Sequence, residues 1–171
     1  MQKEKHSQKN IVLIGMMGCG KTTIARILGK RLNKPVIDID EYIEETYQMT
    51  IHDMFEISED YFRERETICC QELGKLEGYI LSTGGGVIKN QQNIDALKRH
   101  GVIIYIDRPV ENILSDIRVS SRPLLKEGPE KLYALFKERH TLYLDACDVH
   151  IDNVGSLDDV VEKILIACHM I

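Results

Sequence analysis

GMMGCGKT, residues 15–22, is the stretch of this 171-residue chain that decides its fold. It fits the pattern GxxxxGK[ST] of a phosphate-binding loop. Residues 10–14 before it are apolar and β-branched, as in a buried parallel strand, and residues 23–32 after it place apolar side chains at helical spacing. The loop therefore stands between a predicted strand and a predicted helix, which is the context that this motif requires.

The residue types of this loop suit an anionic ligand. Glycines let the backbone fold tightly around a phosphate, and the helix N-terminus aims free N–H groups and a positive dipole end at it. We expect Lys21 to reach the β- and γ-phosphates and Thr22 to offer its hydroxyl to Mg²⁺. The same nucleotide site is predicted to include Gly18, Cys19, Gly20 and Thr23. A chance glycine-rich turn is the alternative.

Composition excludes several other classes of protein. The length suits one domain, 1–171, with a sizeable core, and the net charge of −5 argues against general binding of nucleic acid. No run approaches the ~20 apolar residues of a membrane span. An odd count of five cysteines without CxxC pairs fits neither a disulfide framework nor a zinc site, so we expect reduced thiols in a cytoplasmic protein.

Strand and helix patterns alternate from end to end. Besides 10–14, strands are predicted at residues 35–40, 79–83, 102–106 and 148–152. Helices are predicted from 40 to 47, from Thr50, from 58 to 76, from 90 to 99, from 109 to about 118, from 129 to about 146, and after Ser156. This order predicts an α/β fold, with one parallel sheet covered by helices on both faces and the ligand at the carboxyl ends of the strands. The core would span 10–118 and 129–169, after a loose arm at 1–9.

Two of the predicted strands end in groups that suit a ligand. Asp38 and Asp40 close the second strand, where alternation by two would put both carboxylates on one side, one for Mg²⁺ and one for a substrate hydroxyl. Either aspartate could instead cap a helix. The third strand ends in Gly84, Gly85 and Gly86, whose backbone could approach a ligand closely or simply form a flexible turn.

Three arginines are candidates for binding anions. Arg63 stands three residues before Glu66, so a surface ion pair is the alternative for it, and Arg139 shares a helix face with Tyr143. Arg122 lies in the predicted loop 119–128, where it could close over a transferring phosphoryl group. Arginine rather than lysine suits bidentate capture of a planar carboxylate.

Taken together in order, these motifs resemble the shikimate kinase family over about residues 10–165. They are GMMGCGKT, DID at 38–40, EDYFRERE at 59–66, GGG at 84–86, RPLL at 122–125 and RHTLYLDACD at 139–148. The resemblance implies a P-loop fold like that of the nucleoside monophosphate kinases, with sheet order 2-3-1-4-5. It implies an ATP-dependent phosphotransferase of aromatic amino-acid biosynthesis that phosphorylates the 3-hydroxyl of shikimate.

The resemblance also implies a role for each matching residue. Lys21, Asp40 and Arg122 would be catalytic, with Asp40 also holding the ring hydroxyls and Arg122 at the γ-phosphate. The shikimate carboxylate would be clamped by Arg63 and Arg139, beside Gly84, Gly85 and Gly86. Mg²⁺ would be held by Thr22 and Asp38, and Arg118 would lie against adenine. The acceptor region would cover about 40–77 and a lid about 119–128, in a monomer whose partners are small molecules.

Several rival functions share parts of this pattern. A gluconate kinase or a nucleoside monophosphate kinase would have the same fold, and gluconate also carries a carboxylate and hydroxyls. A GTP-driven switch would need an NKxD motif, which Asn33-Lys34-Pro35-Val36 fails. A catalytically dead binding module should have lost Lys21 or the strand-end aspartate, and both remain.

Overall fold

A five-stranded parallel sheet carries the structure. The computed structural model describes residues 8–119 and 128–170. Its strands are β1 (Asn10–Ile14), β2 (Val36–Asp38), β3 (Ile80–Ser82), β4 (Gly101–Asp107) and β5 (Val149–Asp152). They lie in the order β2-β3-β1-β4-β5, and all four neighbouring pairs are parallel. The predicted sheet and its order are therefore confirmed.

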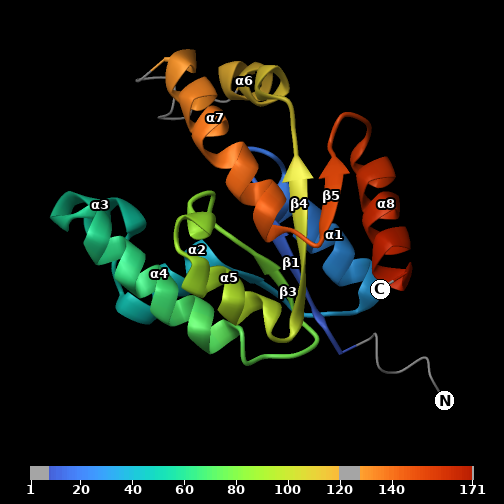
Figure 1. The fold of residues 1–171 in the computed structure, drawn as a ribbon, viewed down its shortest axis with the longest axis horizontal. Coiled ribbons are helices and arrows are strands. Elements are labelled where there is room, and N and C mark those ends of the chain that lie inside the picture. The colour runs from blue at the N-terminus through green and yellow to red at the C-terminus, as the bar shows by residue number, and fades with distance from the viewer. Residues whose placement is uncertain (1–7, 120–127, 171) are drawn as a thin grey trace.

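Helices cover both faces of this sheet (Figure 1). Helix α1 (Lys21–Leu32) packs against β1, β2 and β3 and contacts α8 (Leu157–Met170). On the opposite face, in front of the sheet in Figure 1, α5 (Gln91–Lys98) and α7 (Pro129–Ala146) pack against β4. The remaining elements are α2 (Ile39–Tyr47), α3 (Ile51–Ile57), α4 (Glu59–Leu73), the 3₁₀ turn η1 (Val87–Lys89) and α6 (Val110–Val119).

The central strands form the core. Every residue of β1 is buried, as expected for a strand with neighbours on both sides and helices on both faces. Tyr105 of β4 and Tyr143 of α7 are the bulkiest fully buried side chains, and their rings stack with centroids 4.9 Å apart. Helix α7 is thereby fixed to β4, which matters for the site because α7 carries Arg139.

The boundary between β2 and α2 differs from the prediction. The strand ends at Asp38 and the helix starts at Ile39, so Asp40 lies in the first helical turn instead of at a strand end. Asp38 caps that helix, because its Oδ1 accepts hydrogen bonds from the backbone N–H groups of Asp40 at 3.0 Å and Glu41 at 3.3 Å. The argument from strand alternation was therefore wrong, and the capping role belongs to Asp38.

Other helix signals hold, with small shifts of boundary. Thr50, Ser58 and Ser156 each accept a hydrogen bond from the backbone N–H three residues later. Pro129 is the first residue of α7, whereas Pro109 stands one residue before α6 and accepts its first backbone bonds. None of the five cysteines, all within the described ranges, forms a disulfide. No helix in residues 8–119 and 128–170 has the length and apolarity to cross a membrane.

Candidate active site

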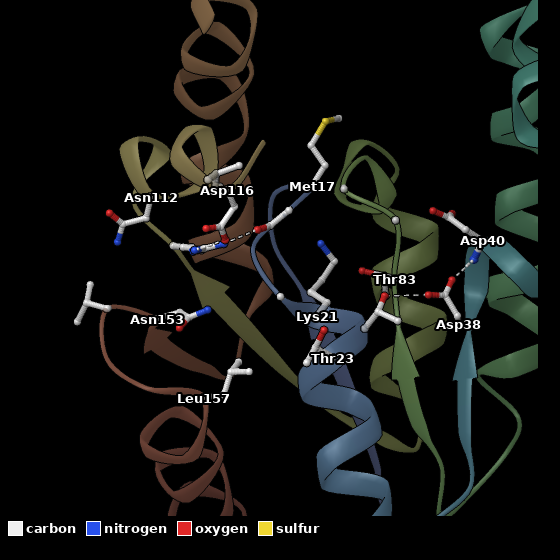
Figure 2. A pocket seen from close by; sticks show the side chains of 18 of the residues that line it. Met17, Lys21, Thr23, Asp38, Asp40, Thr83, Asn112, Asp116, Asn153 and Leu157 are labelled. Atoms are coloured by element: carbon white, nitrogen blue, oxygen red, sulfur yellow. Dashed lines mark hydrogen bonds and ion pairs between the residues drawn. The ribbon is translucent and has the colours of Figure 1, made fainter. Parts of the chain in front are cut away.

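A pocket of about 620 Å³ opens at the carboxyl ends of the strands. Figure 2 shows Lys21 and Thr23 in its middle, Asp38 and Asp40 on one side, and Asn112, Asn153 and Leu157 on the other. The pocket is lined by Met17, Gly18, Gly20, Lys21, Thr22, Thr23, Asp38, Asp40, Thr83, Gly84, Gly85, Arg108, Asn112, Ile113, Asp116, Asn153, Val154, Gly155 and Leu157. It lies where the parallel-sheet rule places a ligand.

The start of α1 is left open for an anion. Gly20 caps this helix in the left-handed conformation, with φ of 100°, which a residue with a side chain rarely adopts. No side chain caps the helix, and no acidic residue stands in its first turn. The first N–H groups of α1 and its positive dipole end therefore face the pocket without competition, as a phosphate requires.

Lys21 is held inside the phosphate loop. Its Nζ donates to the carbonyl oxygens of Gly15 at 2.7 Å and Met16 at 2.9 Å, and it lies 3.6 Å from Cys19 Sγ. Only 7% of Lys21 is exposed, and Cys19 of the same loop is fully buried. The ammonium group is thus fixed by carbonyl dipoles, with no carboxylate in direct contact among the described residues. That leaves its positive charge available to a bound anion.

Two aspartates face Lys21 across the pocket. The Thr22 hydroxyl donates to Asp38 Oδ2 at 3.0 Å, so a hydroxyl and a carboxylate lie together at the pocket wall. Burial, reinforced by the charges of Asp38 and Glu66, raises the pKa of Asp40 to about 6, against the opposing effect of Lys21. Asp40 is therefore a more basic carboxylate than an exposed aspartate, as a residue that accepts a proton near neutral pH needs to be.

The three consecutive glycines after β3 bring three charged groups to one turn. A Cβ on Gly84 would stand 2.8 Å from Asp40 Oδ1, and one on Gly85 would stand 3.4 Å from Arg139 Nη1. A Cβ on Gly86 would overlap the guanidinium group of Arg63. Because the turn lacks side chains, one carboxylate and two guanidinium groups from α2, α4 and α7 approach its backbone together.

Arg63 forms an ion pair with a buried carboxylate. Its Nη1 lies 2.8 Å from Glu66 Oε1, and only 1% of Glu66 is exposed. Burial raises the pKa of Glu66, although Arg63 opposes that effect. The guanidinium group also lies over the Phe62 ring, 5.1 Å from its centroid. The ion pair considered from the sequence is present, but its placement on the surface is wrong, since spacing along a helix does not reveal that the Glu66 side is covered.

Arg139 is a buried arginine beside the glycine turn. It is 7% exposed, its Nε has no hydrogen-bond acceptor, and among the described residues no carboxylate forms an ion pair with it. On the same helix face, the Tyr143 hydroxyl donates to the carbonyl oxygen of Gly85 at 2.5 Å. A buried cation with an unused donor is costly unless an anion joins it, so the site is suited to an anionic ligand.

Sequence reasoning missed the wall of the pocket formed after β4 and β5. Arg108 donates to the Gly18 carbonyl oxygen at 3.0 Å and pairs with Asp116. Asn153, 8% exposed, donates to the Cys19 carbonyl oxygen at 2.9 Å. Both residues directly follow the last residue of a strand, so the rule that ligands bind at strand ends would have found them.

The other predicted residues are only partly gathered in this pocket. Gly18, Gly20, Lys21, Thr22, Thr23, Asp38, Asp40, Gly84 and Gly85 line it, whereas Arg63, Gly86 and Arg139 lie beside it around the glycine turn. Arg118 is part of α6, but its side chain falls outside the described structure, and Arg122 lies outside the described residues altogether.

A phosphate loop on a five-stranded parallel sheet, with a buried acid and two arginines beside it, defines a P-loop kinase for small molecules. The family model of shikimate kinase matches residues 17–169. The chain belongs to the shikimate kinase family, and its activity is that of a shikimate kinase.

Individual relatives agree with this assignment. The chain is 48% identical to a shikimate kinase of Clostridium botulinum (strain Alaska E43 / Type E3), over 92% of this chain and 95% of that one. A structure of shikimate kinase from Acinetobacter baumannii in complex with shikimate superposes with a TM-score of 0.88 at 37% identity, covering 98% and 97% of the two chains. A gluconokinase from Sinorhizobium meliloti shares the fold alone, with a TM-score of 0.59 at 12% identity over 95% and 92% of the chains.

Proposed function

We propose that this enzyme transfers the γ-phosphoryl group of ATP to the 3-hydroxyl of shikimate, giving shikimate 3-phosphate and ADP. The observation that carries the proposal is Arg139, a buried guanidinium group without a carboxylate partner in the described structure, beside Arg63 and Asp40. A carboxylate bound by both arginines would supply the missing anion, with a ring hydroxyl close to Asp40. The relative from Acinetobacter baumannii supports this, since its structure contains shikimate.

The nucleotide is proposed to lie along the phosphate loop. Amides of Gly18, Cys19, Gly20, Thr22 and Thr23 would hold the phosphates, and Lys21 would neutralise charge on the moving group. Adenine is proposed to occupy the opposite wall of the pocket, between Asn112 of α6 and the loop from Asn153 to Leu157. Arg118 and Arg122 keep the roles that the family pattern implies, at adenine and at the γ-phosphate.

The residues at the pocket wall suit Mg²⁺. Thr22 and Asp38 offer a hydroxyl and a carboxylate, the hard oxygen donors that this ion prefers, and they already lie 3.0 Å apart. Bound there, the ion would offset negative charge on the phosphates. The other carboxylate oxygen of Asp38, Oδ1, would still accept the backbone hydrogen bonds at the start of α2, so metal binding and helix capping are compatible.

Asp40 is proposed to orient the acceptor hydroxyl and take its proton. Phosphoryl transfer asks little covalent chemistry of a protein, so positioning and charge neutralisation supply most of the acceleration. A carboxylate whose pKa is about 6 is ionised at pH 7 and still basic enough to accept the proton as the oxygen attacks.

Release of ADP with different acceptors tests the proposal. The purified enzyme, ATP and Mg²⁺ are incubated with shikimate, with gluconate or without acceptor, and ADP is measured by a coupled assay. We expect shikimate to accelerate ADP release at least about 100-fold over either control, because only it fills the acceptor site. If gluconate gave the same rate as shikimate, the assignment of shikimate as the acceptor would be wrong. If the rate were the same without any acceptor, the protein would be an ATPase and not a kinase.

Asp38→Asn tests the magnesium site separately. Asparagine caps helices as well as aspartate, so the start of α2 should survive while one negative ligand is lost. We expect the Mg²⁺ concentration for half-maximal rate to rise about 10-fold or more. Asp53→Asn, an exposed acidic residue in the first turn of α3, is the control and should leave it unchanged. An unaltered Mg²⁺ requirement in Asp38→Asn would remove this residue from the metal site.

A further inference from the structure

A second cluster of polar side chains lies where β4 and β5 end, at the edge of the sheet. In the parallel register of these strands, Tyr105 lies beside His150 and Asp107 lies beside Asp152. Residues two apart on a strand share a face, so Asp107, His150 and Asp152 point to the same side of the sheet. The cluster therefore follows from backbone register and does not depend on a flexible loop.

Two carboxylates side by side on adjacent strands repel each other. His150 bridges the two carboxylates, because its Nε2 lies 2.9 Å from Asp107 Oδ2 and 3.5 Å from Asp152 Oδ1. One oxygen of each aspartate and one nitrogen of the histidine all lie within 4.8 Å of one another. The structure has thus gathered one imidazole and two carboxylates around a single point.

The imidazole ring is held in place by its neighbours. His150 stacks on the buried Tyr105 ring, with centroids 5.2 Å apart and an angle of 15° between the ring planes. The Asp107 side chain is also held in place. It is only 17% exposed, and the Tyr105 hydroxyl and His140 lie beside it. Asp152 is the open side of the cluster, with a side chain 67% exposed.

We propose that Asp107, His150 and Asp152 form a binding site for a divalent transition-metal ion, with Zn²⁺ as the best match. Ligand bonds of about 2.0–2.2 Å in tetrahedral geometry place donor atoms roughly 3.3–3.5 Å apart. The two nitrogen–oxygen separations of 2.9 Å and 3.5 Å lie near this range, and the two carboxylate oxygens lie within 4.8 Å of each other. Mixed imidazole and carboxylate donors favour Zn²⁺ or Co²⁺ over Mg²⁺, which prefers oxygen alone.

This site is separate from the phosphate loop but connected to it. Asp107 and Asp152 immediately precede Arg108 and Asn153, the residues that donate to the Gly18 and Cys19 carbonyl oxygens. A metal ion that joins the ends of β4 and β5 would therefore also steady two side chains that hold the loop. The site goes beyond the kinase reaction, which requires none of these three ligands.

Titration with Co²⁺ tests the proposal. The nucleotide-free enzyme is titrated in buffer with millimolar Mg²⁺, which occupies all-oxygen sites, and visible absorption is recorded. We expect one equivalent of Co²⁺ to give strong d–d bands without thiolate charge transfer, and Zn²⁺ to abolish them. Weak bands of hexahydrated Co²⁺ alone, or bands with thiolate charge transfer, would overturn the site.

Substitutions of two histidines assign the signal. His150→Gln should weaken Co²⁺ binding at least about 100-fold, since even outer partners of a metal change affinity by 10–100-fold. His100→Gln is the matched control, because His100 is 38% exposed beside Glu77 as His150 is 39% exposed beside Asp107. Equal binding by His150→Gln and the parent would refute the assignment.

If His150→Gln folds poorly, the effect of Zn²⁺ on the melting temperature of other variants tests the site instead. Zn²⁺ should raise the melting temperature of the parent and of His100→Gln, because a ligand bound only by the native state stabilises it. Asp152→Asn, which changes an exposed ligand, should fold normally and lose most of that rise. If Asp152→Asn gains as much from Zn²⁺ as the parent, the three side chains do not form the site.

Discussion

Replacing Asp40 by asparagine is expected to lower kcat by about 10²–10⁴-fold while leaving the Kd for ATP almost unchanged. The asparagine carbonyl still accepts a hydrogen bond from the acceptor hydroxyl, but it cannot take the proton. Asp40 contacts the glycine turn instead of the phosphate loop, so nucleotide binding should not depend on it. Initial rates with saturating shikimate, together with ATP binding by calorimetry, separate the two effects.

Glu41→Gln is the control, because Glu41 is exposed in the same helical turn as Asp40 and should leave kcat unchanged. If Asp40→Asn turned over within a few-fold of the parent, Asp40 would have no role in proton transfer.

The same substitution is expected to stabilise the protein near neutral pH. Burial raises the pKa of Asp40 to about 6, so the folded state binds this proton more tightly than the unfolded chain does. Stability is therefore lost as the pH rises from about 4 to about 6, and the ionised group costs about 1–3 kcal/mol above that range. We expect urea denaturation to give a higher free energy of unfolding for Asp40→Asn at pH 7.5, with the difference from the parent shrinking at pH 4.

Replacing Arg139 by alanine is expected to raise the KM for shikimate with little change in the KM for ATP. Loss of one partner from a desolvated pair with the substrate carboxylate costs about 2–5 kcal/mol, which corresponds to about 30- to 5,000-fold. Arg139→Lys should recover only part of this, because an ammonium group cannot form the bidentate pair. Steady-state kinetics with each substrate varied in turn provide the measurement.

Arg31→Ala is the control for this experiment. Arg31 pairs with Glu162 on the surface, its side chain is 38% exposed, and its loss should change neither KM. Because Arg139 is buried, hydrogen-bonds Tyr143 and its positive charge acts on the buried Glu66, the melting temperature of Arg139→Ala is measured first to establish that the variant is folded. An unchanged KM for shikimate in a folded Arg139→Ala protein would remove this arginine from the acceptor site.

Local sequence patterns predicted the frame of this site well. The phosphate loop depends on glycines and a helix start, both of which are encoded within eight residues, and the apolar strands are visible as continuous runs. The order of the strands came from the family resemblance, since no local pattern states which strands are neighbours.

The errors arose where tertiary contacts decide. Strand β2 ends at Asp38 because the Asp38 side chain caps α2. The alternating apolar residues in 35–40 predicted a strand that continued to residue 40. The spacing of Arg63 and Glu66 predicts their ion pair, but it does not predict that the packing of α4 against its neighbours buries Glu66. Arg108 and Asn153 were missed because their bonds to the phosphate loop join segments far apart in sequence.

The glycine turn limits how this enzyme could change its specificity. Any substitution at Gly84, Gly85 or Gly86 adds atoms toward Asp40, Arg139 or Arg63, respectively. Mutation at these positions can only shrink the acceptor chamber, so evolution toward a bulkier acceptor has to begin elsewhere. A competitive inhibitor in contact with this backbone could not be evaded by mutation to a smaller residue, because glycine has no side chain to shorten.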